Sequence, residues 1–283
     1  MSELKVGTPG ATSAQVGEWV CNEKVPSVHD RSIWLFGGRQ RGRSAVKAAP
    51  YVAQTYDWSG FYLGGFVGGG WSHDDASEPD LGIVGVVLGA PPVQTTSGSS
   101  FIGGIEGGDR YQFGKLVIGW EGDIAWGDTG GTSTTAFGPA ALTFNRTLTT
   151  SMKWTATATS TVGIAHDNWL LYGKAGVAWA HLDDTYNSTV AIAGVGTVPF
   201  FSGTGGQDRV GWTVGTGIEW GLWQNWSVKA EYDYIDFGTK TTPFTGTVLP
   251  GIVSVPVSVG LEDNLRVQQV KVGVNYRFLP NLW

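Results

Sequence analysis

The chain has 283 residues, with 44 glycines, 14 tryptophans and 15% charged residues, and a formal net charge of -6 at pH 7. Soluble domains usually carry about a quarter charged residues, and disordered chains carry few aromatic residues, so the composition is typical of neither. The acidic balance argues against nucleic acid as a partner. The single cysteine, Cys21, excludes an intramolecular disulfide framework.

The N-terminal segment, residues 1–50, contains no apolar run long enough for a recognisable signal peptide. It includes the basic, small-residue stretch GGRQRGRSAVKAAP at 37–50. We expect residues 1–50 to be a disordered segment or an atypical leader, which leaves export of the chain as an open question. No stretch of the chain reaches the roughly 18 apolar residues that a membrane-spanning helix requires.

From Trp58 onward, apolar and polar residues alternate with the period of two that predicts β-strands. In the first segment, Phe61, Leu63 and Val67 share one face, and Tyr62 and Phe66 lie on the other. The same pattern recurs in chain order. The predicted strands are 58–71, 100–112, 116–128, 153–165, 169–181, 209–222, 226–238 and 270–278.

The connections between these segments are alternately short and long. Short turns are expected at FGK, HDN and WQN, which are residues 113–115, 166–168 and 223–225. Long loops are expected between the other strands, including 183–208 and 239–263. Six acidic residues are assigned to these loops: Asp74, Asp75, Glu78, Asp80, Asp183 and Asp184.

Eight strands of this length, with short turns at one end and long loops at the other, predict an all-β, antiparallel, up-and-down barrel. About nine to eleven tilted residues suffice for a strand to cross a bilayer. The faces opposite the apolar residues carry charges, which are assigned to the barrel lumen. The predicted lumenal charges are Glu106, Arg110, Glu121, Asp123, Lys174, Glu219, Lys229, Glu231, Asp233, Lys271 and Arg277.

Tryptophan placement favours a transmembrane barrel over a soluble barrel of the lipocalin type. Amphipathic rings gather at the two lipid–water interfaces, whereas a soluble core would place its largest rings in mid-strand. One predicted girdle lies at the long-loop ends of the strands and comprises Trp71, Trp126, Trp154, Trp179 and Trp212. The other lies at the short-turn ends and comprises Trp58, Trp169, Trp220, Trp223, Trp226, Tyr276 and Phe278.

Several segments carry a family resemblance: WSGFYLGGFVGGGW, FIGGIEGGDRYQFGKLVIGWEGDI, NWLLYGKAGVAWA, GWTVGTGIEWGL, NWSVKAEYDYIDFG and VKVGVNYRF. Together they resemble the outer-membrane immunogenic proteins of alphaproteobacteria, which are OmpA-like, eight-stranded barrels of the porin superfamily. The resemblance runs from about Ala49 to Phe278. It implies residence in the outer membrane, with lipid and lipopolysaccharide around the barrel.

The last strand resembles the C-terminal signal that the barrel-assembly machinery reads in this family. The matching residues are Lys271, Gly273, Tyr276 and Phe278. The resemblance therefore implies that this machinery is a partner. Residues 279–283, LPNLW, form a short tail after the signal. Pro280 cannot donate a ladder hydrogen bond, so we expect the barrel to span 51–278.

The interior of an eight-stranded barrel is just wide enough to be filled by side chains. A packed ion-pair network is therefore favoured over a small-solute pore with a narrow charged lumen. The His-x-Ser pair of some lipid A hydrolases is missing, and no metal or cofactor site is predicted. We expect a monomeric, non-enzymatic protein, and the family resemblance implies that it supports envelope integrity and surface contact. The alternatives are the small-solute porin and a ligand-binding or adhesin activity carried by the loops.

Overall fold

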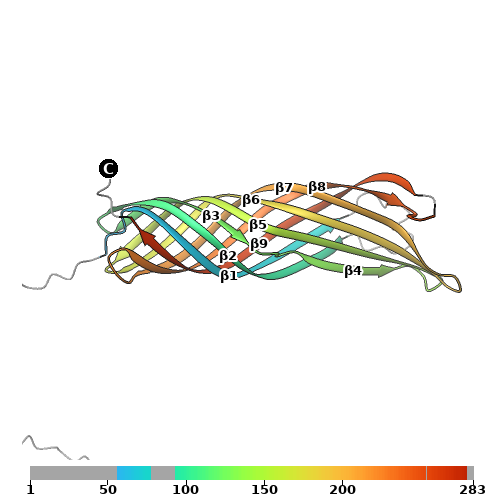
Figure 1. Cartoon of the computed structure of the whole chain (residues 1–283), viewed down its shortest axis with the longest axis horizontal. Coiled ribbons are helices and arrows are strands. Elements are labelled where there is room, and N and C mark those ends of the chain that lie inside the picture. The colour runs from blue at the N-terminus through green and yellow to red at the C-terminus, as the bar shows by residue number, and fades with distance from the viewer. Residues whose placement is uncertain (1–55, 78–92, 253, 279–283) are drawn as a thin grey trace, which may run out of the picture. The chain divides into compact units, whose positions relative to one another are not determined.

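The computed structural model describes residues 56–77, 93–252 and 254–278. They form nine antiparallel strands (Figure 1). The strands are β1 (Gly60–Ser77), β2 (Val93–Phe113), β3 (Leu116–Trp126), β4 (Gly131–Phe137), β5 (Leu142–His166), β6 (Trp169–Ile192), β7 (Gly196–Gly221), β8 (Trp226–Val248) and β9 (Val255–Arg277).

Eight of the nine strands close into a ring in the order β1-β2-β3-β5-β6-β7-β8-β9. The ring closes where β1 pairs with β9, from Tyr62 opposite Arg277 to Ser77 opposite Glu262. A Cβ atom on Gly68 of β1 would lie 2.0 Å from the carbonyl oxygen of Val270, so glycine allows the two strands to approach. The prediction of an eight-stranded up-and-down barrel is confirmed. β4 is an additional short strand that pairs with β5.

The outside of the ring is apolar and the inside is charged. On β9, Val270, Val272 and Val274 are 44–56% exposed, whereas Lys271 between them is fully buried. This polarity is the inverse of a soluble barrel and requires lipid around the outer face. In the parts of the chain that the structure describes, no helix is long and apolar enough to span a membrane.

The short turns lie at one end of the barrel, here called the turn end. Residues 114–115 join β2 to β3, residues 167–168 join β5 to β6, and residues 222–225 join β7 to β8. Gly114 has a φ angle of 62° and Asp167 has one of 53°. Glycine and aspartate are among the residues that tolerate this left-handed conformation, which explains tight turns at these positions.

At the other end, here called the hairpin end, the structure differs from the predicted long loops. β6 runs on to Ile192 and β7 begins at Gly196, so most of 183–208 is strand. The same holds for 239–263, where β8 and β9 face each other up to Val248 and Val255. These segments are rich in Thr, Ser and Gly, yet their ladder pairing continues, because it satisfies backbone groups that a loop would leave to water.

Two belts of exposed aromatic rings border the apolar band. Trp71, Trp126, Trp179 and Trp212 lie toward the hairpin end and are 39–52% exposed. At the turn end, the rings of Trp169 and Trp220 stack with their centroids 5.4 Å apart. The lipid-facing part of each strand lies between these belts. The strands continue beyond the hairpin-end belt, outside the membrane.

The assignment of Trp58 to a girdle is wrong. Trp58 is only 2% exposed and belongs to a buried cluster at the turn end. It precedes β1, so the outward alternation of that strand does not extend to it. Its ring packs on Tyr56, with the two centroids 4.5 Å apart, and closes the barrel interior from the turn end.

Candidate functional site

The barrel interior is the candidate site, and side chains fill it in successive layers. The first, the turn-end layer, is largely apolar and comprises Tyr56, Trp58, Val117, Ala165, Leu170 and Tyr172. These residues come from the segment before β1 and from β3, β5 and β6. An apolar layer at this position separates the lumen from the solvent at the turn end.

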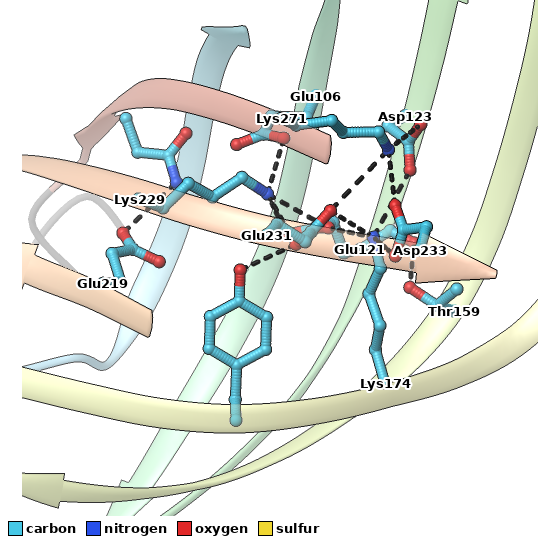
Figure 2. Close-up of polar contacts among 12 residues, drawn as sticks. Glu106, Glu121, Asp123, Thr159, Lys174, Glu219, Lys229, Glu231, Asp233 and Lys271 are labelled. Carbon is cyan, nitrogen blue, oxygen red and sulfur yellow. Dashed lines mark hydrogen bonds and ion pairs between the residues drawn. The ribbon is translucent and has the colours of Figure 1, made fainter. Parts of the chain in front are cut away.

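A network of charges, here called the central network, fills the next layer. Figure 2 shows the side chains of Lys174 and Lys229 between the carboxylates of Glu121 and Glu231, and that of Lys271 reaching Glu231. The Nζ atom of Lys174 lies 3.1 Å from Glu121 Oε1 and 2.6 Å from Glu231 Oε1. All five side chains are fully buried. Buried charges are tolerated only when they are paired in this way.

The remaining acids of the network complete the coordination of the lysines. Lys229 Nζ lies 2.6 Å from Glu106, and Lys271 Nζ lies 3.0 Å from Asp123 and 2.7 Å from Asp233. Lys174 also contacts Asp123 at 3.7 Å and Asp233 at 3.3 Å. The lysines come from β6, β8 and β9, and the acids from β2, β3 and β8, so the network ties together five strands of the ring.

Arg110 joins Glu219 to the central network. Its Nη1 atom donates to Glu219 at 2.7 Å, and its Nη2 atom lies 3.6 Å from Glu121. The structure thus brings ten of the eleven predicted lumenal charges together. The remaining one is Arg277. Its guanidinium lies over the ring of Tyr56 at 4.3 Å and donates to the carbonyl oxygen of Gln224.

The assignment of Arg277 to the charge network is therefore wrong. Among the described residues, no carboxylate lies within ion-pair distance of it. Arg277 is the last residue of β9, so its inward side chain meets the aromatic turn-end layer before it reaches the acids.

Sequence reasoning missed the tyrosines that serve the network. Tyr62 donates to Glu121 at 2.5 Å and Tyr172 donates to Glu231 at 2.7 Å. Both are buried, and both alternate with lipid-facing neighbours on their strands. Their inward position in the period-two pattern was the signal in the sequence from which their contact with the network could have been predicted. Thr159 adds a weaker bond to the backbone oxygen of Glu121 at 3.3 Å.

A second apolar layer, here called the middle apolar layer, covers the central network on the hairpin side. It consists of buried residues from β5, β6, β8 and β9. They are Met152, Ala178, Ala180, Leu182, Ile235, Phe237, Leu265 and Val267. On the neighbouring strands, Phe66, Ile102 and Ala125 form a smaller buried cluster. The central network is therefore enclosed between apolar side chains at both ends.

A second charged group, here called the outer charged layer, lies beyond the middle apolar layer and consists of Asp74, Asp184, Arg209 and Asp263. Assigning Asp74 and Asp184 to solvated loops is wrong, because both are buried inside the barrel, with 3% and 5% exposure. The strand alternation continues past the aromatic belt and turns them inward. Asp75 and Asp183, their sequence neighbours, face outward. Glu78 and Asp80 lie outside the described residues.

The carboxyl groups of the outer charged layer hold protons unusually tightly. Burial, with repulsion from Asp263 and Asp184, raises the pKa of Asp74 to about 8. Burial also raises the pKa of Asp184 to about 6. Arg209 forms an ion pair with Asp263 and opposes these shifts. Within residues 56–77, 93–252 and 254–278, no group of three His, Cys, Asp or Glu side chains is arranged to hold a metal ion.

Comparison with known proteins gives the family. Residues 44–278 match the model of the outer membrane protein β-barrel domain. The 31 kDa outer-membrane immunogenic protein of Brucella melitensis is 28% identical over 243 residues, which cover 83% of this chain and 89% of the relative. The 25 kDa outer-membrane immunogenic protein of Brucella abortus is 25% identical over 239 residues, covering 82% and 85%.

Two solved structures match the chain less closely. Neisserial surface protein A is 18% identical, covers 78% of this chain and 98% of its own, and has a TM-score of 0.34. The outer membrane protease OmpT from Escherichia coli is 11% identical, covers 80% and 99%, and has a TM-score of 0.44. On the family match, which spans all nine strands, the chain belongs to the outer-membrane β-barrel proteins and resides in the outer membrane.

Proposed function

We propose that the protein is a closed, non-enzymatic structural barrel that supports the integrity of the envelope and presents a contact surface outside the cell. One observation carries this proposal: the central network is sealed by apolar layers on both sides. A conducting lumen needs an open, water-filled path, and buried side chains fill the lumen at both of these levels. The side chains that fill the lumen then stabilise the barrel.

The principal alternative is a small-solute porin with a charged, narrow lumen. The buried charges favour it at first sight, because porin channels are polar inside. However, the side chains of Lys174, Glu121 and Glu231 are fully buried and form ion pairs with one another. Their charges are therefore already neutralised and do not offer a binding site to a passing ion. An eight-stranded barrel also has little room beyond its side chains.

Planar-bilayer recording tests the closed lumen. We expect the purified, refolded chain to give no steady unitary openings, because ions would have to cross two apolar layers. A general porin added to the same bilayers shows that the assay detects channels. Steady unitary conductance that scales with the amount of inserted protein would contradict the structural proposal.

The central network is predicted to act in stability. We expect Lys174→Met to cost about 3–5 kcal/mol of unfolding free energy, because four carboxylates would lose a cation that they share in a dry interior. Lys153→Met is the matched control. Its ion pair with Asp183 spans 3.7 Å with 69% of the lysine side chain exposed, so it contributes less than about 1 kcal/mol.

Urea unfolding in lipid vesicles, followed by heat-modifiable gel mobility, measures both variants. Equal stability of Lys174→Met and Lys153→Met would show that the central network is not structural.

The arrangement nearest to a catalytic one among the described residues lies on the outer surface. His73 Nδ1 is 3.1 Å from Ser97 Oγ, and His73 Nε2 is 3.5 Å from Asp75. However, 51% of the histidine side chain is exposed, whereas nucleophilic catalysis relies on a water-excluded site with oxyanion donors. The contacts support a solvated cross-strand pair.

An esterase assay distinguishes a catalytic His73–Ser97 pair from a solvated cross-strand pair. We expect the refolded protein to hydrolyse p-nitrophenyl esters no faster than its own Ser97→Ala variant, in micelles of the same detergent. Hydrolysis by the wild-type chain that the Ser97→Ala substitution abolishes would overturn the non-enzymatic proposal.

The hairpin tips support surface contact. Val195, between β6 and β7, is 77% exposed, and Ile252, between β8 and β9, is 60% exposed. Apolar side chains this exposed, well beyond the aromatic belt, face water and are available to a partner surface. A loop-borne adhesin or ligand-binding activity would use the same tips.

Adhesion of bacteria that display the protein to cultured cells tests the contact role. We expect the double variant Val195→Ser, Ile252→Ser to lower attachment at least twofold, because it removes the exposed apolar groups. The double variant Thr241→Ser, Thr245→Ser, on exposed positions of β8, is the control. Equal attachment by cells with and without the protein would remove surface contact from the proposed function.

A further inference from the structure

The outer charged layer buries more negative charge than it pairs. Three carboxylates, Asp74, Asp184 and Asp263, face one guanidinium, that of Arg209, so full ionisation would leave a net charge of -2. Asp74 Oδ1 and Arg209 Nη1 are buried and have no hydrogen-bond partner among the described residues. An uncompensated charge in such an environment is costly unless it is neutralised.

Apolar side chains close the layer on both sides. On β5, β6 and β9, the inward positions read apolar, polar and apolar toward the hairpin end. These strands carry Leu182, Asp184 and Tyr186 on β6, Leu265, Asp263 and Leu261 on β9, and Met152, Thr150 and Leu148 on β5. The four charged residues of the layer are themselves 1–5% exposed.

Among the described residues, the other strands bring no further charge to this layer, and the next buried cation, Arg146 on β5, lies on the far side of Leu148. β2 contributes the buried residues Gln94 and Thr96, β5 contributes Thr150 and β8 contributes Thr242. On β1 itself, Asp75 faces outward and adds to the repulsion that Asp74 experiences. Arg209 is the cation that lowers the pKa of Asp74, and repulsion from the carboxylates opposes it.

The ladder between β7 and β8 is irregular beside this layer. The ladder between β7 and β8 stops at Thr204 opposite Thr245 and resumes at Trp212 opposite Asp236. Residues 205–211 remain paired with β6 and residues 239–244 with β9, so 205–211 and 237–244 form a seam that lacks ladder pairs only between β7 and β8. On the outer side of the seam, Lys240 Nζ donates to the carbonyl oxygen of Asp208 at 2.7 Å.

The outer charged layer also holds the two sides of this seam together. Asp263 of β9 accepts from Arg209 on β7 and, at 3.1 Å, from Thr242 on β8. Gln207 and Thr242 are hydrogen-bonded across the seam as well. Asp263 therefore links β7 to β8. The charge on the neighbouring acids determines the strength of its ion pair with Arg209.

We propose that Asp74 and Asp184 form a proton-binding site that controls the opening of the β7–β8 seam outside the membrane. When both are protonated, Arg209 pairs with Asp263 and the seam is closed. When they ionise, they repel Asp263 and compete for Arg209, and the seam opens. This device is additional to the structural role, because the seam lies beyond the sealed central network.

The sign of the pH dependence follows from the raised pKa values. A carboxyl group with a pKa of about 8 when closed, against an ordinary value of 3.8, favours the closed state at low pH. That contribution is lost as the pH rises from about 4 to about 8 and then levels off. Asp184 has a pKa of about 6, so most of its contribution to the pH dependence is already lost by pH 7. The interval from pH 7 to 9 therefore isolates Asp74.

Hydrogen–deuterium exchange of the full chain in detergent micelles measures the seam. An open seam would leave residues 205–211 held only by β6 and residues 239–244 held only by β9, as free edges whose remaining ladder bonds open more often. Protection factors, which are corrected for the intrinsic pH dependence of exchange, are compared for peptides covering 205–211 and 237–244. In EDTA, we expect wild-type protection there to fall about tenfold between pH 7 and 9. Asp74→Asn, which removes the charge at nearly constant volume, should keep its protection over that range.

Asp75→Asn is the matched control on the opposite face of β1 and should follow the wild-type profile. A wild-type profile that is flat from pH 7 to 9 would overturn the proposal, and so would an Asp74→Asn profile equal to that of the wild type. Loss of protection at pH 7 on adding EDTA would show that a metal ion, and not a proton, occupies the layer, and would equally overturn it. Bilayer conductance tests the structural proposal separately.

Discussion

The structure depends on the ladder between β1 and β9, because it turns a sheet into a ring. In a bilayer, an unpaired strand edge would expose backbone groups to hydrocarbon, where each costs several kcal/mol. The pairing of Tyr62 with Arg277 through to Ser77 with Glu262 removes that edge along the whole of β1. The apolar outward faces then follow, because lipid is the only solvent that the closed ring meets between its aromatic belts.

Closure with eight strands also determines the interior, which is too narrow to remain empty. The chain fills it with alternating apolar and charged layers, and the central network spans β2, β3, β6, β8 and β9. Such a network specifies one register between strands, since a slip of one residue would turn every buried charge toward lipid. Lys174, with four carboxylates around it, contributes most to this specification.

Much of this could be predicted from the sequence, because period-two alternation reports directly which side chains face inward. The eight ring strands, the short turns and the inward Glu121, Lys174 and Lys271 follow from it. The extended hairpins could not be predicted, because their Thr, Ser and Gly residues read equally well as loop. For the same reason, the inward orientation of Asp74 and Asp184 could not be predicted. Trp58 was misplaced because it precedes β1, where the alternation no longer indicates the direction of a side chain. Arg277 faces inward as predicted, but the alternation does not report that the aromatic turn-end layer, and not the acids, lies at that level.

The most direct test of a barrel filled by its own side chains is solute permeation. Proteoliposomes that contain the refolded chain are diluted into an isotonic solution of a small uncharged sugar, and their swelling is followed by light scattering. The account predicts the swelling rate of protein-free liposomes at every protein-to-lipid ratio. A rate that increases with the amount of protein, and that falls as the sugar becomes larger, would contradict it.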